Sequence, residues 1–121
     1  MTGPLLPTVL DRASGHEESF TLAMDADLAA FRGHFPGNPI LPGVVQVDWA
    51  IRFGVQAFGD LGRFRGIDHL KFQDLVRPGE VLELKLSFDP GHGRLRFRFQ
   101  AGSAKKSSGV VLFACHGRST T

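Results

Sequence analysis

The sequence has little cysteine, no tyrosine and no long apolar run. Its single cysteine, Cys115, excludes an internal disulfide, so we expect a reducing compartment such as the cytoplasm, with Cys115 as a small core residue. No uninterrupted apolar stretch approaches the roughly 18 residues that would span a bilayer. The N-terminal segment lacks the basic and apolar regions typical of a signal peptide. These absences predict one soluble domain, residues 1–121, with no membrane segment.

An excess of charge of one sign is also missing, since 14 Lys and Arg residues face 12 Asp and Glu residues. Basic residues recur at alternate positions in Arg94, Arg96 and Arg98, which places them on one face of a predicted strand. Neither a stacking aromatic motif nor a nucleic-acid fold signature accompanies them, so we expect no nucleic-acid partner and a solvated sheet face. No cluster has the spacing of metal ligands and no nucleotide loop is present. We therefore expect no metal and no organic cofactor.

What the sequence does contain is a stiff loop that leads directly into a helix. Residues 33–43 hold three prolines and three glycines among eleven residues and carry one histidine, His34. Residues 44–58 then follow an apolar pattern with few polar breaks, which predicts about four turns of a mostly buried helix. The helix carries one carboxylate, Asp48. A histidine and a carboxylate held in this way could act as acid and base.

Each residue of this junction also has a purely structural interpretation. Pro42 suits the first helical position, and Gly43 leaves uncovered amides that could polarise a carbonyl oxygen, yet both residues are also ordinary turn residues. His34 could be a hydrogen-bonded loop histidine. Asp48 lies four residues before Arg52, which is the spacing of a helical ion pair. The residue types alone leave both interpretations open.

The remaining segments predict an α+β domain. Strand character is found at residues 8–13 and 18–24, and a short helical turn is expected at 25–31. Beyond the long helix, four strands separated by turn clusters are predicted at 64–75, 81–88, 95–101 and 109–116. We expect the long helix to be wrapped by a curved antiparallel sheet.

The segment GHFPGNPILPGVVQVDWA, residues 33–50, resembles the signature of bacterial β-hydroxyacyl-acyl carrier protein dehydratases of the FabA/FabZ type, which have the hotdog fold. In that family the pattern H-F-P-G-x-P-V-M-P-G-V precedes an acidic residue fourteen positions after the histidine, as His34 and Asp48 are spaced here. The downstream segments GIDHLKF and VRPGE are similar to the family's strand and turn after the helix. The QVDWA segment most resembles the ApeI-like dehydratases linked to aryl polyene synthesis.

This resemblance implies an activity, two partners and three residue roles. The substrate would be a 3-hydroxyacyl thioester on an acyl carrier protein, which loses water to give a trans-2-enoyl thioester in fatty acid or aryl polyene type synthesis. His34 would take the C2 proton and assist the leaving hydroxyl, the Gly43 amide would bind the thioester carbonyl, and Asp48 would hold the C3 hydroxyl. The family also implies a homodimer whose two active sites are shared between subunits.

Two residues depart from the family pattern. Arg52 stands where glutamine is common, and Trp49 replaces a small residue. A cation beside Asp48 favours its charged form, so we expect Asp48 to orient water or hydroxyl and not to donate a proton. Two other functions remain open. A hotdog acyl thioesterase would use a carboxylate and water without this histidine loop, and a degenerate dehydratase would be a non-catalytic acyl-carrier binding module.

Overall fold

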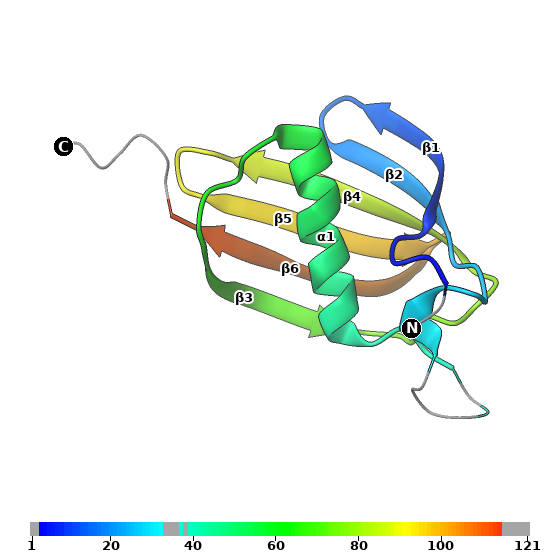
Figure 1. The fold of residues 1–121 in the computed structure, drawn as a ribbon. Coiled ribbons are helices and arrows are strands. Elements are labelled where there is room, and N and C mark those ends of the chain that lie inside the picture. The colour runs from blue at the N-terminus through cyan, green and yellow to red at the C-terminus, as the bar shows by residue number, and fades with distance from the viewer. Residues whose placement is uncertain (1–2, 33–36, 38, 115–121) are drawn as a thin grey trace.

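The described part of the chain folds as one six-stranded antiparallel sheet with a single long helix lying across one face (Figure 1). This computed structural model describes residues 3–32, 37 and 39–114. The long helix is α1 (Gly43–Phe58), and a short 3-10 helix, η1, spans Ala29–Phe31. The strands are β1 (Thr8–Ser14), β2 (Glu18–Ala23), β3 (Phe64–Phe72), β4 (Val81–Asp89), β5 (Arg94–Ala101) and β6 (Ala104–Phe113), in the spatial order β1-β2-β4-β5-β6-β3. The α+β prediction is confirmed.

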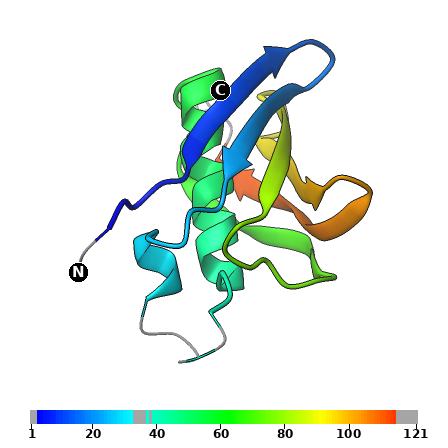
Figure 2. The same ribbon diagram turned by 90° about the vertical axis from the view of Figure 1, so that its right-hand side faces the viewer.

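The hydrophobic core lies between α1 and the face of the sheet that curves around it (Figure 2). The side chains that fill it alternate along the central strands, as period-two patterning requires. On β4 these are Leu82, Leu84 and Leu86, and on β5 they are Leu95, Phe97 and Phe99. From α1 the buried apolar side chains are Val47, Trp49, Ala50 and Phe53. This packing fixes the rotation of α1, so the opposite side of the helix is turned away from the sheet.

Residues at both ends of α1 set its limits. Pro42 has an extended ψ of 147° and occupies the N-cap, so the helix begins at Gly43. We expected Pro42 at the first helical position, and its extended ψ places it one residue earlier. At the other end Gly59 has φ 82° and donates its amide to the Val55 carbonyl at 2.9 Å. Glycine tolerates this φ, and the predicted stop is confirmed.

The start of β6, the end of β3 and the segment before the helix differ from their predictions. β6 begins at Ala104, so the turn expected over residues 102–108 is wrong apart from its first residues. The polar residues there pair with β5, and some of their own side chains are buried. A pattern of alternating apolar residues cannot reveal a strand of this kind. β3 ends at Phe72 and not at residue 75, and a bulge between Asp68 and Lys71 gives His69 a φ of 52°. The turn expected over 25–31 is helical in η1 alone.

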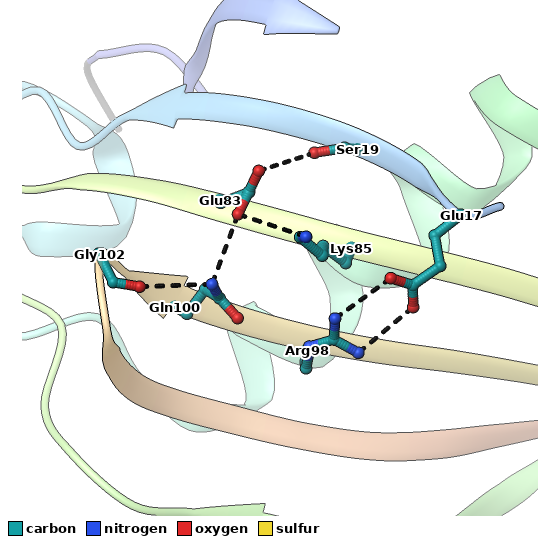
Figure 3. A network of polar contacts seen from close by, with 7 residues as sticks. All are labelled: Glu17, Ser19, Glu83, Lys85, Arg98, Gln100 and Gly102. Carbon is teal, nitrogen blue, oxygen red and sulfur yellow. Dashed lines mark hydrogen bonds and ion pairs between the residues drawn. The ribbon is translucent and has the colours of Figure 1, made fainter. Parts of the chain in front are cut away.

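The face of the sheet opposite α1 is polar (Figure 3). Glu83 accepts a hydrogen bond from Ser19 at 3.1 Å and from Gln100 at 3.4 Å. Arg98 makes a two-pronged ion pair with Glu17, at 3.1 and 3.2 Å. The arginines of β5 do share this face, as their alternation predicts, since the residues between them are buried.

Candidate active site

A hollow of about 450 Å³ lies at the N-terminus of α1. Its walls come from the junction that precedes the helix and from the end of β3 with the loop that follows it. The lining residues are Ile40, Leu41, Pro42, Gly43, Val44, Gln46, Phe72, Asp74 and Leu75. This volume falls within the range of small-molecule sites, and most of the lining side chains are apolar.

Two backbone amides of α1 at this hollow have no hydrogen-bond acceptor among the described residues. The amides of Val45 and Gln46 donate to the Pro42 carbonyl, at 3.1 and 3.2 Å. Among residues 3–32, 37 and 39–114, no acceptor contacts the amides of Gly43 and Val44. Amides in the first turn point toward the N-terminal end of a helix, where the dipole is positive. A carbonyl oxygen that gains negative charge would be stabilised here.

The ring of Phe72 lies directly against Gly43. A Cβ atom added at Gly43 would be 2.5 Å from Phe72 Cζ and 2.8 Å from Cε1, which is closer than real contacts allow. Phe72 is 51% exposed and lines the same hollow. Any larger residue at position 43 would therefore displace the Phe72 ring. Phe72 was not among the predicted site residues, because the only feature of it that the sequence shows is an aromatic residue at the end of a strand.

Asp48 lies on the side of α1 that faces away from the sheet. Arg52 Nε is 2.7 Å from Asp48 Oδ2, so the predicted i,i+4 ion pair is present. The side chains are 51% exposed for Asp48 and 60% for Arg52, which leaves the carboxylate accessible. Val44, one turn before Asp48, is 76% exposed. Within one protomer, this acidic and apolar helix face is uncovered.

The structure places two of the three predicted site residues on the same helix. Gly43 and Asp48 are five residues apart, which is about 7.5 Å along the axis. His34 lies outside the described residues, and its role as the base stays a prediction. Cys115 lies outside them as well, so its predicted place in the core is not described.

Three buried polar residues at or next to the hollow were not among the predicted site residues. Gln46 and Ser107 are 3% and 1% exposed, and the Ser107 hydroxyl donates to Gln46 Oε1 at 2.7 Å. Lys106 is also buried. Lys106 and Ser107 belong to the polar run of residues 102–108, which we expected to form a turn. A glutamine on the apolar face of α1 was the one available signal.

Lys106 ties β6 to the loop that forms one wall of the hollow. Its ammonium lies 2.8 Å from Glu80 and 3.1 Å from Asp74, and it donates to the Leu75 carbonyl at 2.8 Å. Burial alone would lower the pKa of Lys106, but hydrogen bonds to Glu80 and Asp74 outweigh it and raise that pKa. The hydrogen bond from Lys106 lowers the pKa of Asp74. The loop is thus fixed by a buried cation.

A match to a known protein family identifies the relatives of this chain. The sequence model of the ApeI-like family, described as ApeI dehydratase, matches residues 11–110, which is most of the chain. The chain belongs to the ApeI-like dehydratase family. The predicted resemblance to FabA/FabZ-type enzymes of the ApeI-like subgroup is confirmed.

Individual relatives of this ApeI-like chain agree with that assignment. A 3-hydroxyacyl-[acyl-carrier-protein] dehydratase FabZ of Oenococcus oeni is 34% identical over 92 residues, covering 70% of this chain and 66% of the relative. The ApeI-like chain thus spans slightly less than two thirds of that protein's length. A chain of the dehydratase heterocomplex ApeI:P from Xenorhabdus doucetiae is 35% identical, with a TM-score of 0.79 over 88% of this chain and 96% of its own.

The hotdog prediction for the ApeI-like chain is confirmed by these structural neighbours. The dehydratase domain of PpsC from Mycobacterium tuberculosis has a TM-score of 0.69, covering 94% of this chain and 44% of its own. At 21% identity it supports the fold alone. The hotdog architecture therefore holds well beyond the close relatives.

Trp49, one of the two departures from the dehydratase pattern, does not line the hollow of the ApeI-like chain. It is 2% exposed, and its Nε1 donates to the Leu5 carbonyl at 3.2 Å. The indole therefore anchors the N-terminal segment against α1.

Two further observations concern the surroundings of the ApeI-like site. A second hollow of about 280 Å³ lies on the polar side of the sheet, and its basic residues are Lys71, Lys85, Arg96 and Arg98.

Within the described part of the chain, no three metal-binding side chains come together, and no helix has the length and apolar character needed to cross a membrane.

Proposed function

We propose that this chain converts 3-hydroxyacyl thioesters, carried on an acyl carrier protein, to trans-2-enoyl thioesters in the cytoplasm. The product would serve fatty acid or aryl polyene type synthesis. The observation that carries the proposal is the match to ApeI-like dehydratases over residues 11–110, a span that includes His34, Gly43 and Asp48. A hollow of small-molecule size, beside helix amides that no described residue binds, supports the same reaction.

The reaction needs a base, an acid and a site for negative charge. A neutral His34 imidazole takes the C2 proton, and the electron pair of that C–H bond forms the C2–C3 double bond as the C3–O bond breaks. The imidazolium then protonates the departing hydroxyl, so water leaves. Negative charge that develops on the thioester oxygen is stabilised by the Gly43 amide. Asp48, held by Arg52, accepts the hydrogen bond of the C3 hydroxyl and orients the departing water.

We also propose that a second copy of the chain completes each site. Asp48 and Val44 lie on a helix face that the protomer's own sheet leaves uncovered. The strand β3 is an edge strand with exposed apolar side chains, and an unpaired edge is a natural place for a second strand to add. A symmetric pair of β3 edges would give a homodimer in which each subunit contributes to both sites.

The first experiment follows hydration and dehydration by ultraviolet absorbance, with carrier-linked and coenzyme A-linked 3-hydroxyacyl and 2-enoyl thioesters. We expect the native protein to interconvert them, and His34→Ala to lose at least about 100-fold in kcat. Asp48→Asn should lose activity as well. His16→Ala is the matched control, since His16 is an exposed histidine in the turn between β1 and β2.

Other outcomes identify other functions. Release of free thiol from a plain acyl thioester, with no water loss from the hydroxyacyl substrate, would indicate a thioesterase. Binding of acyl carrier protein without either reaction would indicate a binding module. Full activity of His34→Ala would overturn the role of that residue.

A further inference from the structure

Gln46 holds both of the peptide units that lead into Gly43. Its backbone amide donates to the Pro42 carbonyl at 3.2 Å, and that carbonyl belongs to the peptide unit whose N–H is the Gly43 amide. Its side-chain Nε2 donates to the Leu41 carbonyl at 3.2 Å, which belongs to the preceding unit. Gln46 therefore hydrogen-bonds to two consecutive peptide units, to one through its backbone amide and to the other through its side chain.

Fixing these two carbonyls determines the direction of the Gly43 N–H. A trans peptide unit is planar, with its C=O and N–H on opposite sides, so a held Pro42 carbonyl sets the direction of the amide. The two planes meet at Pro42, whose ring fixes φ, here −61°. Only ψ of Pro42 stays free to rotate between them. With both carbonyls held, this last rotation is blocked.

Gln46 is itself anchored on the opposite side of the core. Ser107 on β6 donates its hydroxyl to Gln46 Oε1 at 2.7 Å, and both side chains are almost completely buried. From another direction, the Leu41 amide donates to the Val76 carbonyl at 2.8 Å. Leu41 is thus tied through its carbonyl to Gln46, which Ser107 holds from the sheet, and through its amide to Val76 in the loop before β4.

Stability alone does not account for a buried glutamine at this position. The other buried side chains of α1 are apolar. A buried hydrogen-bonded pair contributes modestly to net stability, and an apolar pair of similar shape can replace it at little cost. What an apolar pair cannot supply is direction, because hydrophobic contacts are not directional. The polar pair can orient the Leu41 carbonyl, to which Gln46 Nε2 donates.

We propose that Gln46, oriented by Ser107, is a positioning residue that aims the Gly43 amide at the thioester oxygen. The inference rests on the proposed dehydratase function and deepens it. The Gln46 side chain acts through the Leu41 carbonyl, and its effect is largest when charge on the thioester oxygen is largest.

The test compares Gln46→Leu with the native protein. The variant keeps the backbone amide and side-chain bulk but loses the side-chain hydrogen bonds, so we expect kcat to fall by about tenfold to 100-fold. KM and the pH dependence of kcat should change little, since the acid-base residues are untouched. Gln56→Leu is the matched control, because it makes the same change on an exposed position of α1 and should leave kcat unaltered.

A second readout needs no turnover. In the His34→Ala background, the infrared band of a ¹³C-labelled thioester carbonyl reports its polarisation when a 3-hydroxyacyl substrate is bound. Gln46→Leu should move this band to higher frequency, and Gln56→Leu should not. Ser107→Ala, which frees Gln46 Oε1, should shift kcat and the band in the same direction by a smaller amount.

The outcomes separate the two proposals. An inactive native protein overturns the dehydratase function. An active native protein, with kcat and the carbonyl band unchanged in Gln46→Leu, overturns the positioning role alone. Where circular dichroism shows that Gln46→Leu does not fold, Ser107→Ala decides, and an unchanged kcat and band in that variant reject the inference.

Discussion

At the residue scale, Gly43 combines an amide at the helix N-terminus with a Cα that lies directly under an aromatic ring. No acceptor among residues 3–32, 37 and 39–114 binds the amide, and a Cβ would lie 2.5 Å from Phe72 Cζ. Because Phe72 is half exposed, the ring could move aside and the fold would survive. It would move within the hollow that we assign to the thioester. A larger residue at position 43 should therefore harm activity more than stability.

We predict that Gly43→Ala lowers kcat/KM by at least about tenfold, which is about 1.4 kcal/mol of transition-state stabilisation. Thermal unfolding should change little, since alanine favours helix over glycine by about 1 kcal/mol. Removing ring atoms in Gly43→Ala/Phe72→Leu should restore part of kcat/KM. Gly15→Ala is the control, because a Cβ there meets no atom within 4 Å. Unchanged kcat/KM in Gly43→Ala would contradict the close-approach argument.

Local spacing predicts some of these residues and not others. The Asp48–Arg52 ion pair follows from i,i+4 geometry, which the sequence shows directly. The Ser107–Gln46 hydrogen bond joins residues 61 positions apart. No periodicity encodes such a contact, because it depends on how β6 crosses beneath α1.

At the element scale, α1 and the central strands could be predicted because their buried faces repeat with fixed periods. The end of β3 and the start of β6 could not. β3 is an exposed edge strand interrupted by bulges, so it has no alternating pattern. β6 begins with polar residues. Lys106 among them can be buried because the carboxylates of Asp74 and Glu80 form ion pairs with its ammonium group. The loop after β3 therefore depends on charge, and its stability should depend on pH.

We predict that Asp74→Asn destabilises the protein at neutral pH and that this difference disappears in acid. The pKa of Asp74 is lowered in the folded state by the hydrogen bond from Lys106. A lowered folded pKa means that the stabilisation is present above about pH 4, the unfolded value, and is lost as pH falls through the folded value. Urea unfolding from pH 7 to pH 3 measures the difference between native and variant proteins.

Asp11→Asn, an exposed change on β1, is the control and should give no such pH-dependent difference. A destabilisation by Asp74→Asn that keeps its full size at pH 3 would show that the carboxylate does not act through its charge.

At the scale of the whole molecule, one protomer leaves a strand edge and a helix face uncovered. β3 is the sheet edge beside β6, and its exposed apolar residues are Phe64, Ile67, Leu70 and Phe72. Val44 adds to them at the N-terminus of α1. A long exposed apolar edge is a liability for a soluble monomer and a natural interface for a second copy. Sequence patterning predicts the strand but not its place at the edge, which follows from the order of the sheet.

We therefore predict that Ile67→Glu breaks self-association. In a two-fold symmetric pairing of β3 edges, each substitution occurs twice, and two like charges are brought close together. Sedimentation at several concentrations should show a native dimer and an association weakened by more than about tenfold in the variant.

Val9→Glu is the matched control, since Val9 is an apolar residue of the opposite edge, 42% exposed against 40% for Ile67. Activity should fall together with the dimer, although His34, Gly43 and Asp48 are unchanged, because we propose that each site contains residues of both subunits. A native monomer with full dehydratase activity would contradict the shared site, and a native monomer active only after a different subunit is added would replace self-pairing with a heterodimer.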